Sequence, residues 1–144
     1  MTESPCAFCA IVAGRIDAAI VFEDDVSIAF LDHRPLFLGH TLLVPRLHVE
    51  LLPDLPAELL QPFFGAAQLL TRAVQEATAA DGAFLALNHR VSQSVPHVHL
   101  HIIPRRFHDG LRGFFWPRQR YPDADQMAET ARSISAAAAR LRGG

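Results

Sequence analysis

Hydrophobic spacing and the residues that begin or end helices together predict three helices. Residues 56–79 carry apolar side chains at intervals of three and four, which is the period of a helix with one buried face. Pro62 lies inside this run, and a proline there either kinks the helix or marks its true start. Residues 6–13 predict a short helical turn that ends at Gly14, and residues 123 to about 141 predict a final helix.

Short apolar runs bounded by turn residues predict strands. These runs are residues 19–22, 26–31, 40–44, 83–87 and 97–103. Because long helical segments separate the strand pairs, the order favours an α+β fold with a largely antiparallel sheet. No internal repeat and no spacer rich in Pro, Gly or Ser divides the chain, so we expect one domain over residues 1–144. Within it we distinguish an N-terminal segment at residues 6–9 and a C-terminal tail at about 105–144.

Composition narrows the classes of partner. The chain has 144 residues, of which 50% are hydrophobic, and its formal net charge is −2. A chain of this size and hydrophobicity can form one core, and its small net charge argues against binding of duplex nucleic acid. A single nucleotide needs only a few well-placed donors and stays possible. No stretch is long enough to span a bilayer and no signal peptide is visible, so we expect a cytoplasmic protein without a membrane partner.

The two cysteines, Cys6 and Cys9, form a C-x-x-C motif. In a reducing compartment such a pair indicates a metal clip or a redox pair, although both residues could also be simple buried apolar side chains. A zinc site needs two more ligands. His48 and His97 are the candidates, and the site would then be structural, joining the N-terminal segment to the sheet.

Three histidines alternate with aliphatic residues in the segment His97-Val98-His99-Leu100-His101. Because strand side chains alternate between faces, the three imidazoles share one face and the aliphatic side chains belong to the core face. Three interpretations compete: solvated surface histidines, a metal site made by the three rings, and covalent catalysis in which one imidazole attacks and its neighbours orient it. The alternation alone does not separate the last two.

The surroundings favour covalent catalysis. Asn88 and the run Ser92-Gln93-Ser94 precede the histidines and offer short neutral donors, which hold an anion without adding a competing charge. A metal site would more naturally add a carboxylate, and residues 82–106 contain neither Asp nor Glu. A metal-bound imidazole would also lose the lone pair that it needs for attack.

The segment His97-Val-His-Leu-His-Ile-Ile resembles the signature of the histidine triad (HIT) family, His-x-His-x-His followed by two apolar residues. The similarity extends over residues 6 to about 104. It includes Cys6-Ala-Phe-Cys9-Ala-Ile-Val-Ala-Gly14, Val21-Phe-Glu-Asp-Asp-Val26, Ala29-Phe-Leu-Asp32 and Gly39-His40-Thr-Leu-Leu-Val-Pro45 followed by His48. Asn88 and Gln93-Ser94 resemble the phosphate loop of the family.

The resemblance implies an α+β fold with a five-stranded antiparallel sheet, one long helix and one C-terminal helix, usually paired into a homodimer. It implies attack on the α-phosphate of a nucleotide through a nucleotidyl-histidine intermediate, with His99 as the nucleophile. Further roles follow by position: phosphate contacts at Asn88, Gln93, Ser94 and His101, a supporting role for His40, and ribose contacts at Leu31 and Asp32. Some family members similarly carry zinc on two cysteines and two histidines at the positions of Cys6, Cys9, His48 and His97.

Two segments depart from the family pattern. The phosphate loop at residues 88–96 is shorter than the common form and lacks its glycines, and the tail at residues 110–118 is aromatic and basic. The substrates we expect are purine nucleoside phosphoramidates, acyl or sulfo nucleotides, or dinucleoside polyphosphates, with adenosine or guanosine as the nucleoside. No step of this chemistry requires a divalent metal. The alternative is a nucleotide- or zinc-binding regulatory module with negligible turnover.

Overall fold

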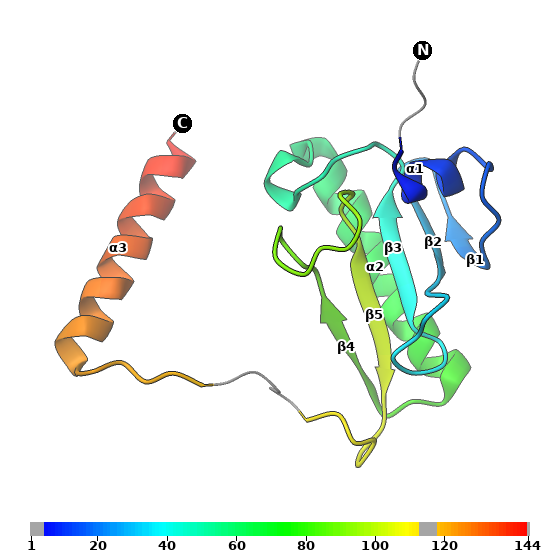
Figure 1. Cartoon of the computed structure of the whole chain (residues 1–144). Helices are drawn as coiled ribbons and strands as arrows, with labels where there is room; N and C mark the ends of the chain where they lie inside the picture. The colour runs from blue at the N-terminus through cyan, green and yellow to red at the C-terminus, as the bar shows by residue number, and fades with distance from the viewer. Residues whose placement is uncertain (1–4, 113–117, 144) are drawn as a thin grey trace. The chain divides into compact units, whose positions relative to one another are not determined.

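The computed structural model describes residues 5–112 and 118–143. It divides the chain into two compact units, Met1–Asp109 and Gly110–Gly144. The first unit holds the sheet, and the second holds the C-terminal helix (Figure 1). The aromatic part of the predicted tail, residues 114–116, lies outside the described residues. The single-domain organisation over residues 1–144 stays a prediction.

The first unit is built on a five-stranded antiparallel sheet, as predicted (Figure 1). Its strands, in their spatial order, are β1 (Ile20–Glu23), β2 (Ser27–Leu31), β3 (Thr41–Pro45), β5 (Leu100–Arg105) and β4 (Gly82–Ala86). Strands β1 and β4 are therefore the edges. Strand β5 lies between β3 and β4, so the histidine segment enters the sheet at an interior strand.

The long helix α2 spans Ala57–Thr78 and follows a short 3₁₀ turn at Leu52–Asp54. Its buried residues have the predicted helical spacing: Phe63, Ala66, Ala67, Leu70 and Val74. Pro62 lies in the second turn of α2, so the interpretation that it marks the helix start is wrong. A proline at this position removes the hydrogen bond to the carbonyl of Glu58 and crowds that carbonyl, and the burial of the helix face beyond it offsets this cost. The helix ends at Ala79, which adopts the left-handed conformation.

The two faces of the sheet carry different layers. On one face, residues of β2, β3 and β5 pack with α2; they are Ala29, Leu43, Leu100 and Ile102. On the other face, Ile28, Phe30, Leu42 and Val44 pack with Cys6 and Phe8 at the start of the short helix α1, which spans Ala7–Val12. Helix α1 ends as predicted just before Gly14, which has a positive φ of 76°. The face covered by α1 is the one that carries the histidines.

Strand β5 begins at Leu100, three residues later than the sequence predicts. The pairing with β3 runs from Thr41 opposite Ile102 to Leu43 opposite Leu100 and stops there. Beyond it the backbone N–H of Val98 donates to the carbonyl of Val49 at 2.8 Å. The alternation nevertheless continues, since Val98, Leu100 and Ile102 all belong to the core cluster on the α2 face.

The second unit contains α3, Ala124–Arg142, close to the predicted bounds. Asp123 caps it by accepting a hydrogen bond from the backbone N–H of Gln126 at 2.7 Å, which is a common way to begin a helix. Within the part of the chain that the structure describes, no helix is long and apolar enough to cross a membrane.

Candidate active site and metal centre

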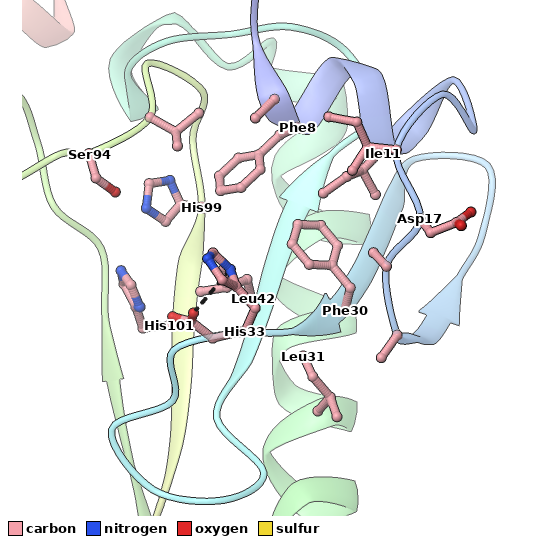
Figure 2. A pocket seen from close by; sticks show the side chains of 16 residues that line it. Phe8, Ile11, Asp17, Phe30, Leu31, His33, Leu42, Ser94, His99 and His101 are labelled. Atoms are coloured by element: carbon pink, nitrogen blue, oxygen red, sulfur yellow. Dashed lines mark ion pairs between the residues drawn. The ribbon is translucent and has the colours of Figure 1, made fainter.

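A cleft of about 720 Å³ lies on the α1 face of the sheet (Figure 2). One part is apolar and is formed by side chains of α1, β2 and β3, including Phe8, Ile11, Phe30 and Leu42. The other part is polar and holds Asp32, Ser94, His99 and His101; with Leu31, which also lines the cleft, these are five of the residues that the sequence predicts for nucleotide binding. The cleft therefore joins an apolar chamber to a row of hydrogen-bonding groups.

His99 is buried, with a relative exposure of 3%, and its tautomer follows from its hydrogen bond. Its Nδ1 lies 2.8 Å from the main-chain carbonyl oxygen of His97. A carbonyl oxygen only accepts, so Nδ1 carries the proton and Nε2 carries the lone pair. The ring of Phe8 packs edge-on against the imidazole with ring centroids 5.0 Å apart. The ring is thus held from two sides.

His40 and His101 form a directed pair. The backbone N–H of Leu36 donates to Nδ1 of His40 at 3.1 Å, so the neutral His40 ring carries its proton on Nε2. That Nε2 lies 2.9 Å from Nδ1 of His101, and it donates there. The same logic leaves the proton of neutral His101 on Nε2. The pair therefore presents an N–H donor on His101, whose ring centroid lies 5.0 Å from that of His99.

The pair is neutral at physiological pH. Burial lowers the pKa of His40, and the nearby Asp32 carboxylate opposes the shift. The pKa of His101 falls to about 4, first because of burial and then because His99 and His40 repel a second positive charge, while Asp32 again acts in the opposite direction. Asp32 Oδ2 lies 3.7 Å from His40 Nε2, which is close enough for that effect.

The shortened loop at residues 88–96 is held without glycines. Arg90 and Ser92 both adopt positive φ angles, 70° and 61°. The side-chain Nε2 of Gln93 donates to the carbonyl of Glu50 at 2.7 Å, and its Oε1 accepts from the N–H of Arg90 at 3.0 Å. Ser94 lines the cleft, whereas Asn88 and Gln93 are not among the lining residues. The amide of Gln93 thus fixes the loop in this state.

The cysteines and two histidines come together as predicted for a metal site. The ligand atoms of Cys6, Cys9, His48 and His97 lie within 4.8 Å of one another. Nδ1 of His97 is 3.4 Å from Sγ of Cys6 and 3.6 Å from Sγ of Cys9, and Nδ1 of His48 is 3.1 Å from Sγ of Cys9. Tetrahedral zinc, with bonds of about 2.3 Å to sulfur and about 2.0 Å to nitrogen, requires sulfur–nitrogen separations of about 3.5 Å. The donor set therefore fits zinc.

The hydrogen bonding of His97 also fits a metal ligand. Its Nε2 donates to the carbonyl of Pro45 at 2.7 Å, which leaves the lone pair on Nδ1, the atom that faces the cysteines. Burial lowers the pKa of His97, and its hydrogen bond to Pro45 partly offsets this. The ring does not line the cleft. We expected the His97 ring to orient His99, but the carbonyl of His97 has that contact instead, because the ring turns toward the cysteines.

A second group of possible ligands does not fit a metal. Asp32, His40 and His101 also lie within 4.8 Å of one another. Metal binding through Nε2 of His40 would place the proton on Nδ1, where the N–H of Leu36 already donates. This arrangement favours a hydrogen-bonded relay. The interpretation of solvated histidines is wrong, since His97 and His99 are 0% and 3% exposed.

Two contributions to the site were missed in the sequence. The main-chain groups of Leu36 and Pro45 set the tautomers of His40 and His97, and no side-chain pattern reports them. Phe8 contacts the His99 ring, and the available signal was its place between Cys6 and Cys9.

The model of the HIT domain family matches residues 13–108. A HIT-like protein of Mycobacterium tuberculosis is 41% identical over 74% of this chain and 76% of its own length. The adenosine 5'-monophosphoramidase HNT1 of Saccharomyces cerevisiae is 33% identical over 93% of this chain and 83% of its own length. The adenylylsulfatase HINT3 of Arabidopsis thaliana is 33% identical over 76% of this chain and 56% of its own length.

Solved structures have the same fold. A HIT family protein of Bacillus subtilis has a TM-score of 0.82 and 34% identity, covering 92% of this chain and 96% of its own. A zinc-bound histidine triad family protein of Mycobacterium smegmatis has a TM-score of 0.71 and 37% identity, covering 96% of each chain. Sequence, fold and the arrangement of the histidines agree, and the chain belongs to the HIT family.

Proposed function

We propose that this protein is a nucleotide hydrolase or transferase that attacks the α-phosphate of a purine nucleotide with Nε2 of His99. The observation that carries the proposal is the hydrogen bond from His99 Nδ1 to the carbonyl of His97, because it leaves the lone pair of a rigidly held imidazole on Nε2. The names of two relatives, an adenylylsulfatase and an adenosine 5'-monophosphoramidase, support this reaction class.

The cleft suits a nucleoside monophosphate unit. The base would occupy the apolar chamber beside Phe8 and Phe30 (Figure 2). The ribose would lie at Leu31 and Asp32, where the carboxylate accepts hydrogen bonds from the sugar hydroxyls. The α-phosphate would then reach the polar part of the cleft.

The phosphate contacts would come from the end of the loop and from the histidines at the start of β5 and just before it. Ser94, His99 and His101 line this part of the cleft. We assign further phosphate contacts to Asn88 and Gln93 by their positions in the family motif. Gln93 would have to exchange its bond to Glu50 for one to the substrate, so substrate binding would rearrange the loop.

The chemistry proceeds in two displacements. Nε2 of His99 forms a bond to phosphorus while the bond from phosphorus to the leaving nitrogen or oxygen breaks, and the leaving group takes its proton from water. The Nε2–H of neutral His101 donates a hydrogen bond to the phosphate or to the leaving atom, and His40, which donates to Nδ1 of His101, keeps that hydrogen on Nε2. Water, or another acceptor in a transferase, then attacks the phosphorus and releases the nucleotide from His99.

The metal has a different task. Zinc held by Cys6, Cys9, His48 and His97 would act structurally by tying the N-terminal segment to the sheet, and the zinc-bound relative from M. smegmatis supports this assignment. The phosphoryl chemistry itself is expected to need no divalent metal, since neutral hydrogen-bond donors face the charge that develops.

The protein is expected to act as a homodimer in the cytoplasm, where reduced thiols are available to bind metal. Its edge strand β4 and its helix α2 expose apolar side chains: Leu60, Phe64, Leu69 and Leu85 are 39%, 42%, 53% and 41% exposed. A two-fold pairing of this surface would cover them.

The alternative function is a nucleotide- or zinc-binding regulatory module. A thermal-shift series with AMP and GMP, run beside a turnover assay on adenosine 5'-phosphoramidate, separates the two. Both functions predict stabilisation by bound nucleotide, and only the enzyme releases AMP from the phosphoramidate. Stabilisation without product would support the regulatory module and contradict our proposal.

A further inference from the structure

Metal ligands and cleft residues are interleaved along one short segment. Cys6 and Cys9 contribute two of the four atoms of the Cys₂His₂ cluster, which we define as Cys6, Cys9, His48 and His97. Ala7, Phe8 and Ile11, from the same turn and a half of helix, line the cleft. Helix α1 is therefore at once a support of the metal cluster and a wall of the cleft.

Phe8 links the two places directly. Its side chain is 7% exposed, and its ring packs edge-on against His99, with centroids 5.0 Å apart, and against His97, with centroids 5.9 Å apart. On its far side it meets Phe30, another cleft residue, at 5.4 Å. One ring thus contacts a metal ligand, the proposed nucleophile and the apolar chamber.

Helix α1 has little intrinsic stability. It contains six residues, fewer than an isolated helix needs to persist in water. Its N-cap is Cys6, whose sulfur accepts from the N–H of Cys9 at 3.4 Å, so even its local cap is made by a metal ligand. What fixes α1 on the sheet is the packing of Phe8 and its neighbours together with the contacts of the cysteines to His97 and His48.

We propose that metal binding at the Cys₂His₂ cluster and nucleotide binding in the cleft are energetically coupled through α1 and Phe8. A loaded cluster holds α1 in place, so the wall of the cleft is already ordered when the nucleotide arrives. A bound nucleotide in turn packs against that wall and holds the cysteines near the two histidines. Coupling of this kind is reciprocal: each ligand must raise the affinity for the other by the same factor.

The proposal rests on the proposed function in one respect, that the cleft takes a nucleotide; it does not depend on turnover. The opposing view is that the cluster only stabilises the fold and leaves the cleft unaffected. The two views differ in whether AMP affinity changes with metal content in protein that is still folded.

The first experiment measures AMP binding by calorimetry on zinc-loaded protein and on protein freed of metal by a chelator, with circular dichroism to establish that both are folded. We expect AMP to bind the metal-free form at least about fivefold more weakly. Equal dissociation constants in two folded forms would overturn the coupling. If AMP binds neither form, the assignment of the cleft fails together with the proposed function.

A second experiment works even if the metal-free protein unfolds. Zinc transfer from the loaded protein to an excess of a chromogenic chelator is timed with and without saturating AMP. We expect AMP to slow zinc release at least about fivefold. An unchanged release rate, in protein that binds AMP, overturns the coupling and leaves the proposed function intact.

Two variants identify the route. Phe8→Leu keeps all four ligands and an apolar side chain but lacks the ring, so the slowing of zinc release by AMP should fall toward none. Leu31→Ala alters the cleft away from α1. It should weaken AMP binding, yet saturating AMP should slow zinc release from this variant as much as it does from the unmodified protein. If AMP slows zinc release from Phe8→Leu as much as it does from the unmodified protein, general stabilisation by the bound ligand explains the effect and the role of Phe8 is refuted.

Discussion

The free energy of unfolding at neutral and acidic pH gives a quantitative test of the burial of His101, when the unmodified protein is compared with the variant His101→Gln. The pKa of His101 is about 4 in the folded protein, whereas an unfolded histidine has a pKa of about 6.5. Above pH 6.5 the residue is neutral in both states, and its contribution to stability is complete. As the pH falls from 6.5 to 4, the unfolded chain binds a proton that the folded protein does not, and this contribution is lost.

The size of the effect follows from the two pKa values. At pH 5 nearly every unfolded chain carries the proton on His101 and about one folded molecule in ten does, which corresponds to a loss of about 2 kcal/mol. Burial also lowers the pKa values of His40 and His97, so the contributions of these two residues to stability likewise decrease as the pH falls. Both remain in the His101→Gln variant, and the difference between the two proteins isolates His101.

The assay is urea unfolding followed by circular dichroism at pH 7.5 and pH 5.0, on metal-free samples of both proteins. We expect the unmodified protein to lose about 2 kcal/mol more than His101→Gln between these values, with equal m-values. A loss equal in both proteins to within about 0.5 kcal/mol would refute the reasoning, because His101 would then titrate alike in the folded and unfolded states.

Three further predictions concern the metal, the assembly and the relay. Protein purified without chelator should contain one zinc per chain, and metal removal should lower stability more than it lowers turnover at saturating substrate; elemental analysis finding far less than one zinc per chain would count against the cluster. Sedimentation at micromolar concentration should give the mass of two chains, and the mass of one chain would refute the homodimer. His101→Ala should slow turnover less than loss of His99 does, as steady-state kinetics can measure; equal losses would mean that His101 is more than a hydrogen-bond donor.

Local patterns were enough to predict the elements of the fold. The period of three and four residues found α2, because its buried face repeats along one segment. The alternation around His99 assigned Val98 and Leu100 correctly to the core face. The start of β5 was misjudged because pairing with β3 ends at Leu100, and the partner strand is distant in sequence.

The chemistry of the site was harder to predict because it depends on long-range main-chain contacts. The C-x-x-C spacing, with His48 and His97 as the candidate partners, led to the four ligand atoms that the structure brings together. The direction of the His97 ring depends on the carbonyl of Pro45, and the tautomer of His40 depends on the N–H of Leu36. Gln93 bonds to Glu50, a residue of another loop, so its state before substrate arrives could not be read from its own motif.

The central claim is that Nε2 of His99 becomes covalently bonded to the nucleotide. The most direct measurement mixes the protein with adenosine 5'-phosphoramidate, quenches in base, where phosphorus–nitrogen bonds last longer than in acid, and maps the adduct by peptide mass spectrometry. We predict an adenylyl group on His99, absent in His99→Asn, which should still bind AMP while its turnover falls at least about a hundredfold. An adduct on His97 or His101, or near-normal turnover by His99→Asn, would contradict the account.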